Sequence, residues 1–367
     1  MRNQPALRFW SFLALTALLA IAVLGFVFPP AGRTPRPAVR MQASDPGPSG
    51  YRLIKTIPIP GTTFWDYMKY DPASHHLFVS HGTHVVVVNP RTGKIVGNIG
   101  PMKGIHGIVV ARQFNRGFVT DGAAAKLWIF NLRTLKIIGS APTDRDADGV
   151  VYDPASKRVF TMNGDSHTST VVDARTGKVV GHIALGGGPE FPVADGRGHV
   201  FANIETTSEI VEINSRTMKI THRWPLAPGR SPSGLAIDRK HHLLFSGCHN
   251  QLMVIMNADT GKVVATEPIG RGVDATRFDP GTGYAFSSNG MSGNLTVIHE
   301  DSPTRFHVVE NVPTEARART MALDPVTHEV FLDTAKFEPL KNPPPGTPRW
   351  RRFRMVPGSF HLLVFAR

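Results

Sequence analysis

The sequence is poor in the features that define several common classes of protein. It has a single cysteine, Cys248, in 367 residues, so no intrachain disulfide can form and stability must come from packing. Charged residues make up 19% of the chain and aromatic residues 8%, against 35 glycines and 30 prolines. This composition argues against wholesale disorder and is typical of a β-rich globular protein with many tight turns. There is no GxSxG elbow, phosphate-binding loop or dinucleotide fingerprint, which counts against acyl transfer.

The one long apolar run covers residues 9–28 and follows Arg2 and Arg8. As a helix, a run of this length would span about 30 Å, enough to cross a bilayer. Positive charge on its N-terminal side predicts that everything after Phe28 lies outside the cytoplasm. We therefore predict a signal-anchor or signal peptide at residues 1–28 and a Pro/Arg-rich tether at residues 29–50. The predicted location is extracytoplasmic, periplasmic or cell-surface, with the protein membrane-anchored, or secreted if the segment is cleaved.

From Tyr51 onward the sequence repeats itself. A turn, usually Asp-Pro, marks each copy at Asp71, Ala111, Asp153, Asp195, Asp238, Asp279 and Asp324, with spacings of 40 to 45 residues. That period matches a four-stranded propeller blade. The seventh copy lacks a fourth strand, while residues 51–59 resemble a fourth strand without a partner. We predict an all-β, seven-bladed β-propeller at residues 51–367, preceded by the apolar helix and closed by its N-terminal strand in the last blade.

Several phrases of the repeat carry a family resemblance. They are FVS at residues 78–80, VVDARTGKVV at 171–180, PSGLAID at 232–238 and LTVIHED at 295–301. Over residues 51–367 the chain resembles the YVTN-repeat, YncE-like propeller family. The resemblance implies the seven-bladed fold and says little of function, because propellers host unrelated activities.

Two sets of polar residues are predicted to converge on one face around the central channel. Five residues before each marker turn, at the start of the innermost strand, are Asp66, His106, Asp148, Glu190, Ser233, Asp274 and Arg319. The loops after the second strands contribute His81, Asp121, Asn163, Ile204, Cys248, Asn289 and Thr334, with Glu205 and His249 beside them. We predict a ligand site made by the first set with His81, Asp121, Asn163, His249 and Asn289. Alternatively, these residues only cap turns and contact channel water.

The four carboxylates of the first set suggest two kinds of chemistry. Their mutual repulsion would raise some of their pKa values unless a cation or Arg319 lies among them. Asp66, Asp148, Glu190 and Asp274, with His106, His81 or His249, could hold a divalent metal ion, with Asp148 and Glu190 as its first candidates. A divalent metal is the only cofactor that the residues suggest. Alternatively, a carboxylate and a histidine could act as an acid/base pair in hydrolysis or elimination. No metal-ligand spacing or nucleophile motif establishes that the protein is an enzyme.

The net charge of +13 lies mostly outside the repeats. Residues 1–50 hold five arginines against Asp45 alone, and residues 336–354 hold six basic residues against Glu338 alone. The basic, Pro-rich segment 336–357 interrupts the last blade between its second and third strands. It carries Arg349, Trp350, Arg351, Arg352 and Arg354. We expect it to lie over the functional face, either gripping nucleic acid, anionic polymer or lipid headgroups, or as a plain solvated insertion.

The leading interpretation is a monomeric, membrane-tethered binding or scaffold propeller that engages a ligand or a protein partner. The alternatives are a metal-assisted lyase or hydrolase on the same face, and binding of nucleic acid or anionic polymer by the basic loop. The blades are only mildly basic, which argues against a nucleic-acid groove in the propeller body, and nucleic acid is not the favoured partner. The pairs at 75–76 and 241–242, all histidines, are predicted to be solvent-exposed turn residues on the opposite face.

Overall fold

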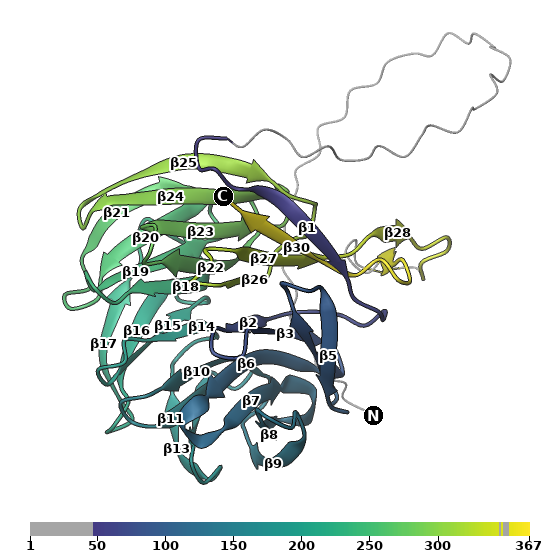
Figure 1. Cartoon of the computed structure of the whole chain (residues 1–367). Helices are drawn as coiled ribbons and strands as arrows, with labels where there is room; N and C mark the ends of the chain where they lie inside the picture. Colours follow the sequence, from purple (N-terminus) through teal and green to yellow (C-terminus); the bar gives the residue numbers. More distant parts are fainter. Residues whose placement is uncertain (1–46, 345, 348–351) are drawn as a thin grey trace, which may run out of the picture. The chain divides into compact units, whose positions relative to one another are not determined.

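The computed structural model describes residues 47–344, 346–347 and 352–367. Over these residues the chain forms seven four-stranded antiparallel sheets, arranged like the blades of a propeller (Figure 1). In six blades the four strands are consecutive in sequence, with the innermost strand first. The predicted all-β, seven-bladed fold is therefore confirmed. The only helices among the described residues are two single 3-10 turns, η1 (Arg112–Phe114) and η2 (Gly122–Ala124).

The strands of the first three blades follow one another with short turns. Blade 1 contains β2 (Met68–Asp71), β3 (His76–His81), β4 (His84–Asn89) and β5 (Lys94–Ile99). Blade 2 contains β6 (Ile105–Ala111), β7 (Arg116–Asp121), β8 (Lys126–Asn131) and β9 (Ile137–Pro142). Blade 3 contains β10 (Ala147–Asp153), β11 (Arg158–Asn163), β12 (Thr168–Asp173) and β13 (Val179–Ala184).

The next three blades repeat the pattern. Blade 4 contains β14 (Pro189–Ala194), β15 (His199–Ile204), β16 (Glu209–Asn214) and β17 (Lys219–Pro225). Blade 5 contains β18 (Pro232–Asp238), β19 (Leu243–Cys248), β20 (Leu252–Asn257) and β21 (Val263–Pro268). Blade 6 contains β22 (Val273–Asp279), β23 (Tyr284–Asn289), β24 (Asn294–Ser302) and β25 (Arg305–Pro313).

The seventh blade joins the two ends of the domain. From the inside outward it consists of β26 (Met321–Leu323), β27 (Val330–Thr334), β30 (His361–Ala366) and β1 (Arg52–Pro58). Strand β1 pairs antiparallel with β30, from Arg52 opposite Ala366 to Pro58 opposite His361 (Figure 1). The predicted closure by the N-terminal strand is confirmed, and it leaves no half-finished sheet at the junction.

The core lies between the faces of neighbouring blades. Each blade places a phenylalanine at the same position of its second strand, at most 2% exposed in every case: Phe78, Phe118, Phe160, Phe201, Phe245, Phe286 and Phe331. Burying one such ring stabilises the fold by about 1.5–3 kcal/mol, so a repeated aromatic position supports all seven interfaces alike.

The segment predicted as a basic insertion leaves the sheet between β27 and β30. It forms a two-stranded ladder of β28 (Phe337–Pro339) and β29 (Phe353–Met355). The Arg317 guanidinium lies 4.0 Å from the Phe337 ring centre and 5.4 Å from that of Phe353, so cation–π contacts tie the ladder to the propeller.

The predicted apolar helix and most of the predicted tether fall on residues 1–46, outside the described residues. Within the described part of the chain, no helix is both long enough and apolar enough to span a bilayer. The end of the tether packs against blade 6, where the Ser49 hydroxyl donates to Glu310 over 2.5 Å. The location and anchoring of the protein stay predictions.

Candidate functional site

The first predicted set of polar residues does meet at the propeller axis. Asp66 and Arg319 lie just before β2 and β26, whereas His106, Asp148 and Asp274 lie near the starts of β6, β10 and β22. Because each stands at the inner edge of its own blade, residues about 40 positions apart become neighbours. We call these five residues, together with Glu190 and Glu205, the hub.

Two cations link three carboxylates on one side of the hub. His106 Nδ1 lies 2.6 Å from Asp66 Oδ2 and 3.5 Å from Asp148 Oδ1. Arg319 Nη1 lies 2.5 Å from Asp274 Oδ2, and its Nη2 lies 3.7 Å from Asp66 Oδ1. The result is a continuous ionic chain from Asp148 to Asp274 that crosses five blades.

The pKa values on this side follow from burial and pairing. Burial alone would lower the pKa of His106, but Asp148 and Asp66 outweigh it and raise that pKa to about 9. Burial raises the pKa of Asp148 to about 7, even though the His106 charge opposes the shift. Burial also raises the pKa of Asp274, against the opposing effect of Arg319. His106 is thus a cation at neutral pH, whereas Asp148 is close to its titration point.

On the other side of the hub, no described Arg or Lys forms an ion pair with the carboxyl groups. Glu190, in β14, and Glu205, directly after β15, lie close enough for each carboxyl group to shift the pKa of the other. Burial raises the pKa of Glu190 well above its ordinary value, and Asp148 and Glu205 raise it further. His249 Nε2 lies 3.9 Å from Glu205, and burial lowers its pKa, which disfavours a compensating positive charge there.

A second layer of side chains packs beside the hub. The Tyr67 ring centre lies 4.7 Å from that of Phe191, and the Arg277 guanidinium lies 4.9 Å from the Phe191 ring centre. Burial raises the pKa of Tyr67 well above its ordinary value, and the hub carboxylates raise it further, so its hydroxyl stays protonated. Burial lowers the pKa of Lys69 to about 8.

Small residues let the inner strands come together. Gly107 directly follows His106 in β6, and a Cβ on it would lie 2.7 Å from the Asp148 carbonyl oxygen and 2.6 Å from Val150 Cγ1. Gly234 in β18 is as tightly enclosed, because its Cβ would lie 2.5 Å from the Thr276 nitrogen. Any larger side chain at these positions would push the neighbouring blade away.

Of the loop residues, Glu205 lies in the hub with His249 beside it, whereas Asp121, Asn163 and Asn289 form hydrogen bonds elsewhere. Asp121 is buried and accepts from the backbone of Lys103, Gly104 and Ala124 and from Trp128 Nε1. Asn163 and Asn289 bond to hydroxyl groups within their own blades.

Two further members of the predicted sets are also engaged elsewhere. His81 is fully buried, and its Nδ1 lies 2.7 Å from the Thr63 hydroxyl. Burial lowers the pKa of His81 to about 4. Ser233 is buried and donates to the Asp274 carbonyl oxygen.

The basic loop is only partly within the described residues. Arg349, Trp350 and Arg351 lie outside them. Arg352 donates to the Thr347 carbonyl oxygen, and Arg354 pairs with Glu338 at 2.7 Å. Both side chains are exposed, and both make their contacts inside the insertion.

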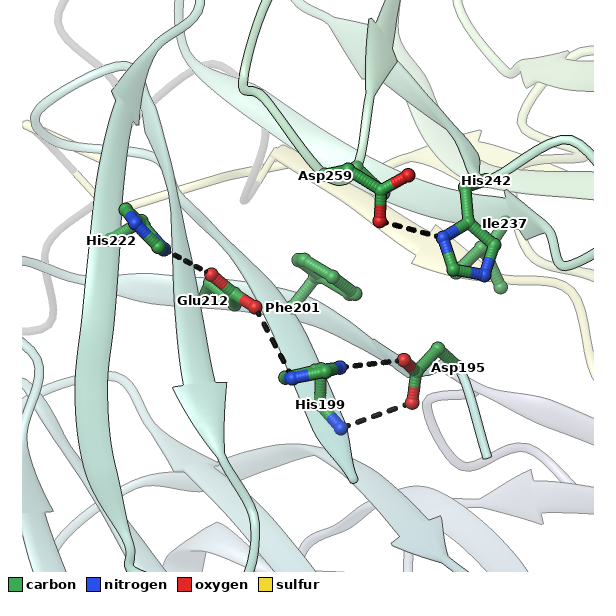
Figure 2. Close-up of a pocket in the computed structure, with 9 residues that line it drawn as sticks. Asp195, His199, Phe201, Glu212, His222, Ile237, His242 and Asp259 are labelled. Carbon is green, nitrogen blue, oxygen red and sulfur yellow. Dashed lines mark hydrogen bonds and ion pairs between the residues drawn. The ribbon is translucent and has the colours of Figure 1, made fainter. Parts of the chain in front are cut away.

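A second cluster of histidines and carboxylates lines a cavity of about 110 Å³ between blades 4 and 5 (Figure 2). It lies where β14 ends and therefore at the opposite end of that strand from Glu190. His199 Nδ1 is 2.8 Å from Asp195, His242 Nδ1 is 2.7 Å from Asp259, and His222 is hydrogen-bonded to Glu212. Each of these histidines already has a carboxylate partner within the cavity lining.

Sequence reasoning missed the setting of these histidines. His241 and His242, predicted to be solvent-exposed, are half-buried and paired with carboxylates, because neighbouring strands and blades approach the turn that bears them. His241 Nδ1 lies 2.7 Å from Asp238 and 2.6 Å from Glu300 of blade 6. The sequence signal that could have revealed this pairing was the two adjacent histidines together with acidic residues in the next repeat.

Comparison with known proteins supports the fold and no finer grouping. No family model matches the chain, and no curated protein sequence matches it. Among solved structures, the chain is similar to the WD40 repeats of RRP9, with 8% identity and a TM-score of 0.70 over 88% of this chain and 100% of that one. It is also similar to Kuenenia stuttgartiensis hydrazine synthase, with 14% identity and a TM-score of 0.64 over 75% and 92%. A chain of a mitotic checkpoint complex is similar too, with 13% identity and a TM-score of 0.67 over 94% and 99%.

These similarities establish a seven-bladed propeller with WD40-like neighbours. At such identities they say nothing of activity. The resemblance to the YncE-like family stays a prediction.

Proposed function

We propose that this protein is a binding propeller that captures a cationic group at the hub, between Glu190 and Glu205. The observation that carries the proposal is the carboxyl pair itself, whose two groups shift each other's pKa and form no ion pair with a described Arg or Lys. A bound cation would favour the ionised form of both groups and would also be attracted by Asp148 and Asp274, both of which raise the pKa of Glu190.

The cation could come from either of two sources. A divalent metal ion would bind the carboxylate oxygens directly, whereas a protonated amine of a small ligand or of a partner protein's lysine would donate hydrogen bonds to them. One similar structure belongs to a protein complex by its title, which supports a role for the fold in partner binding at that general level.

Titration calorimetry on the purified full chain tests this proposal. We expect heat of binding for Ca²⁺ or Mn²⁺ if the source is a metal, and for n-butylammonium if it is an amine. Glu190→Gln should weaken either by about tenfold or more, because it removes one charge from the pair. Affinity should rise as the pH increases through the raised pKa values of Glu190 and Glu205, because a cation binds best to the ionised carboxylates. If no cation binds at millimolar concentration, or if Glu190→Gln binds as well as the parent, the proposal is wrong.

A second candidate function is metal-assisted hydrolysis or elimination on the same face. Asp66, His106 and Asp148 favour it, because each offers one ligand atom and these atoms all lie within 4.8 Å of one another. A metal ion there would have to displace the proton from His106. Metal analysis that shows one ion per chain, lost in Asp148→Ala, would support this function over simple capture.

The remaining predictions on partners lack a specific observation in their favour. Arg352 and Arg354 contact groups within the insertion, so nucleic-acid binding by the basic loop gains no support from them. A membrane-tethered, extracytoplasmic location is part of this proposal and rests on the N-terminal sequence alone.

A further inference from the structure

The outer hairpin of blade 6 departs from the repeat. Its strands β24 and β25 have nine residues each, whereas the corresponding strands of blades 1 to 5 have six or seven. In those blades the third strand ends in an Asn or Asp that accepts a hydrogen bond from the backbone of the following turn. Asn89 does so from Thr92 over 3.0 Å, and Asp173 from Thr176 over 2.7 Å.

His299 occupies this turn-capping position in blade 6. An imidazole does not form the Asx turn that the other blades use, and the extended hairpin has no need of it. The architecture of the repeat therefore does not account for a histidine at this position.

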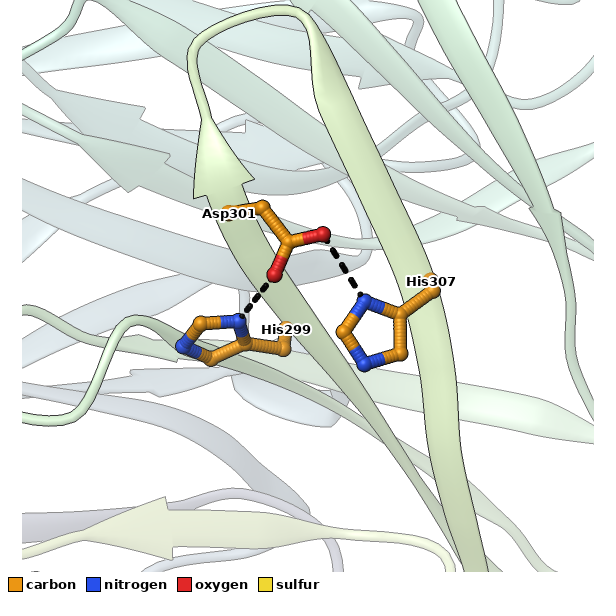
Figure 3. Close-up of side chains that lie close together, drawn as sticks. All are labelled: His299, Asp301 and His307. Atoms are coloured by element: carbon orange, nitrogen blue, oxygen red, sulfur yellow. Dashed lines mark hydrogen bonds and ion pairs between the residues drawn. The ribbon is translucent and has the colours of Figure 1, made fainter.

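The backbone of the hairpin brings two more polar side chains to His299. His307 stands directly opposite it in the β24–β25 ladder. The register shifts between Glu300 and Ser302, so Asp301 is the extra residue of a β-bulge. A bulge re-aims a side chain, and here the Asp301 carboxylate lies between the two rings (Figure 3). His299 Nδ1 is 2.8 Å from Asp301 Oδ1, and His307 Nδ1 is 3.0 Å from Asp301 Oδ2.

We propose that His299, Asp301 and His307 form a binding site for a transition-metal dication of the Zn²⁺ type. One ligand atom from each lies within 4.8 Å of the others. In a tetrahedral zinc site with bonds of about 2.0–2.2 Å, ligand atoms stand about 3.3 Å apart. The two nitrogen–oxygen separations of 2.8 and 3.0 Å would have to open by about 0.3–0.5 Å. Two imidazole nitrogens select zinc-type metals over Ca²⁺ and Mg²⁺, which prefer oxygen ligands alone.

The surroundings of the trio suit a metal with one open coordination position. The edge of Tyr284 packs on the His299 ring, with ring centres 5.3 Å apart, and restrains its orientation. Side-chain exposures of 34%, 23% and 53% for His299, Asp301 and His307 leave the site reachable from solvent. A water molecule or a partner's ligand atom would complete the tetrahedron.

Two neighbouring charges bear on the strength of binding. Glu267, on β21 of blade 5, lies near enough for the charge of His307 to lower its pKa, although burial raises that pKa overall. It would add to the attraction for a dication. The Arg305 guanidinium lies 3.3 Å from Asp301 Oδ2, is 76% exposed, and would have to swing into solvent when metal binds.

The test uses the full chain without a histidine tag, stripped of metal and titrated with Zn²⁺, with Co²⁺ absorption as an independent readout. The variant His299→Asn restores the residue type of four of the other blades, and Asp301→Asn removes only the charge. We expect each to lose one equivalent of Zn²⁺ or to bind it about 10- to 100-fold more weakly, without the tetrahedral Co²⁺ spectrum of the parent. Ca²⁺ and Mg²⁺ should not compete.

The matched control is His182→Ala, which removes an exposed histidine that pairs with the single carboxylate of Asp144 at 3.1 Å. It should bind Zn²⁺ as the parent does. The proposal is overturned if both hairpin variants keep the affinity and stoichiometry of the parent, or if His182→Ala weakens binding by the same factor.

Discussion

At the scale of the residue, the hub depends on a glycine that permits close backbone packing as well as on charged side chains. Gly107 lets the Asp148 backbone come beside His106, and this approach places their side chains in ionic contact. The absence of a side chain at Gly107 therefore lets the hub residues of blades 2 and 3 lie close together.

Gly107→Ala should lower the free energy of unfolding by about 1–3 kcal/mol, because the added methyl group overlaps the neighbouring backbone. Gly139→Ala, in β9 of the same blade, is the matched control, since nothing lies within 4 Å of its Cβ position. That variant should be neutral or stabilising by up to about 1 kcal/mol. Urea denaturation measures both changes. Equal losses in the two variants would contradict the role given to Gly107.

The sequence predicted where the hub residues stand in their strands, but it did not predict the direction in which the loop side chains point. The repeat register places Asp66, His106 and Asp148 at equivalent points, and the structure brings them together. The same register could not show that Asp121 and Asn163 point into their own blades. Their orientation depends on which backbone NH and hydroxyl groups lie beside them, and those neighbours come from other turns.

At the scale of the element, strand β1 has the clearest structural role. It supplies the outer strand of blade 7, and Ile57 is 2% exposed in a cluster that contains Phe331 and Leu362. The strand alternates, so Ile54 on the same segment is 47% exposed. One strand thus offers a buried and an exposed isoleucine three residues apart.

Ile57→Asp should destabilise the propeller by on the order of 3 kcal/mol or more, because it buries a charge at the ring closure. Ile54→Asp should change the free energy of unfolding by no more than about 0.5 kcal/mol. Thermal and urea unfolding of both variants would separate the two cases. Comparable stability of the variants would mean that closure by β1 contributes little.

Sequence reasoning predicted the strands better than the hairpin of blade 6. Alternating apolar residues and a turn at a constant spacing are local signals, which a single chain displays. The bulge at Asp301 is not local, because it follows from how β24 pairs with β25. A histidine at the position where other repeats have Asn or Asp was the only hint.

At the scale of the whole molecule, the hub should set part of the pH dependence of stability. Glu190 has a raised pKa in the folded protein, so the folded state keeps a proton that the unfolded chain loses near pH 4.5. The contribution of this group to the free energy of unfolding therefore falls as pH rises from about 4.5 toward the folded pKa.

Glu190→Gln removes this dependence because glutamine does not ionise. The free energy of unfolding of the variant minus that of the parent should therefore increase with pH, and it should be larger at about pH 8 than at about pH 5. Glu205→Gln should behave in the same direction, since burial raises the pKa of Glu205 as well. Unfolding measured at both pH values tests this. A difference between variant and parent that stays constant with pH would refute it.

Repeat spacing alone determines that the propeller has seven blades and that the two ends of this domain meet, because both follow from counting strands along the sequence. It also determines which residues stand at the inner edge of each blade. Only the tertiary structure decides which of those charges are balanced. Arg319 lies between Asp274 and Asp66, His106 lies between Asp66 and Asp148, and Glu190 is left with Glu205. Ion pairing depends on distances of a few ångströms between different blades, and those distances come from packing and strand register rather than from spacing in the chain.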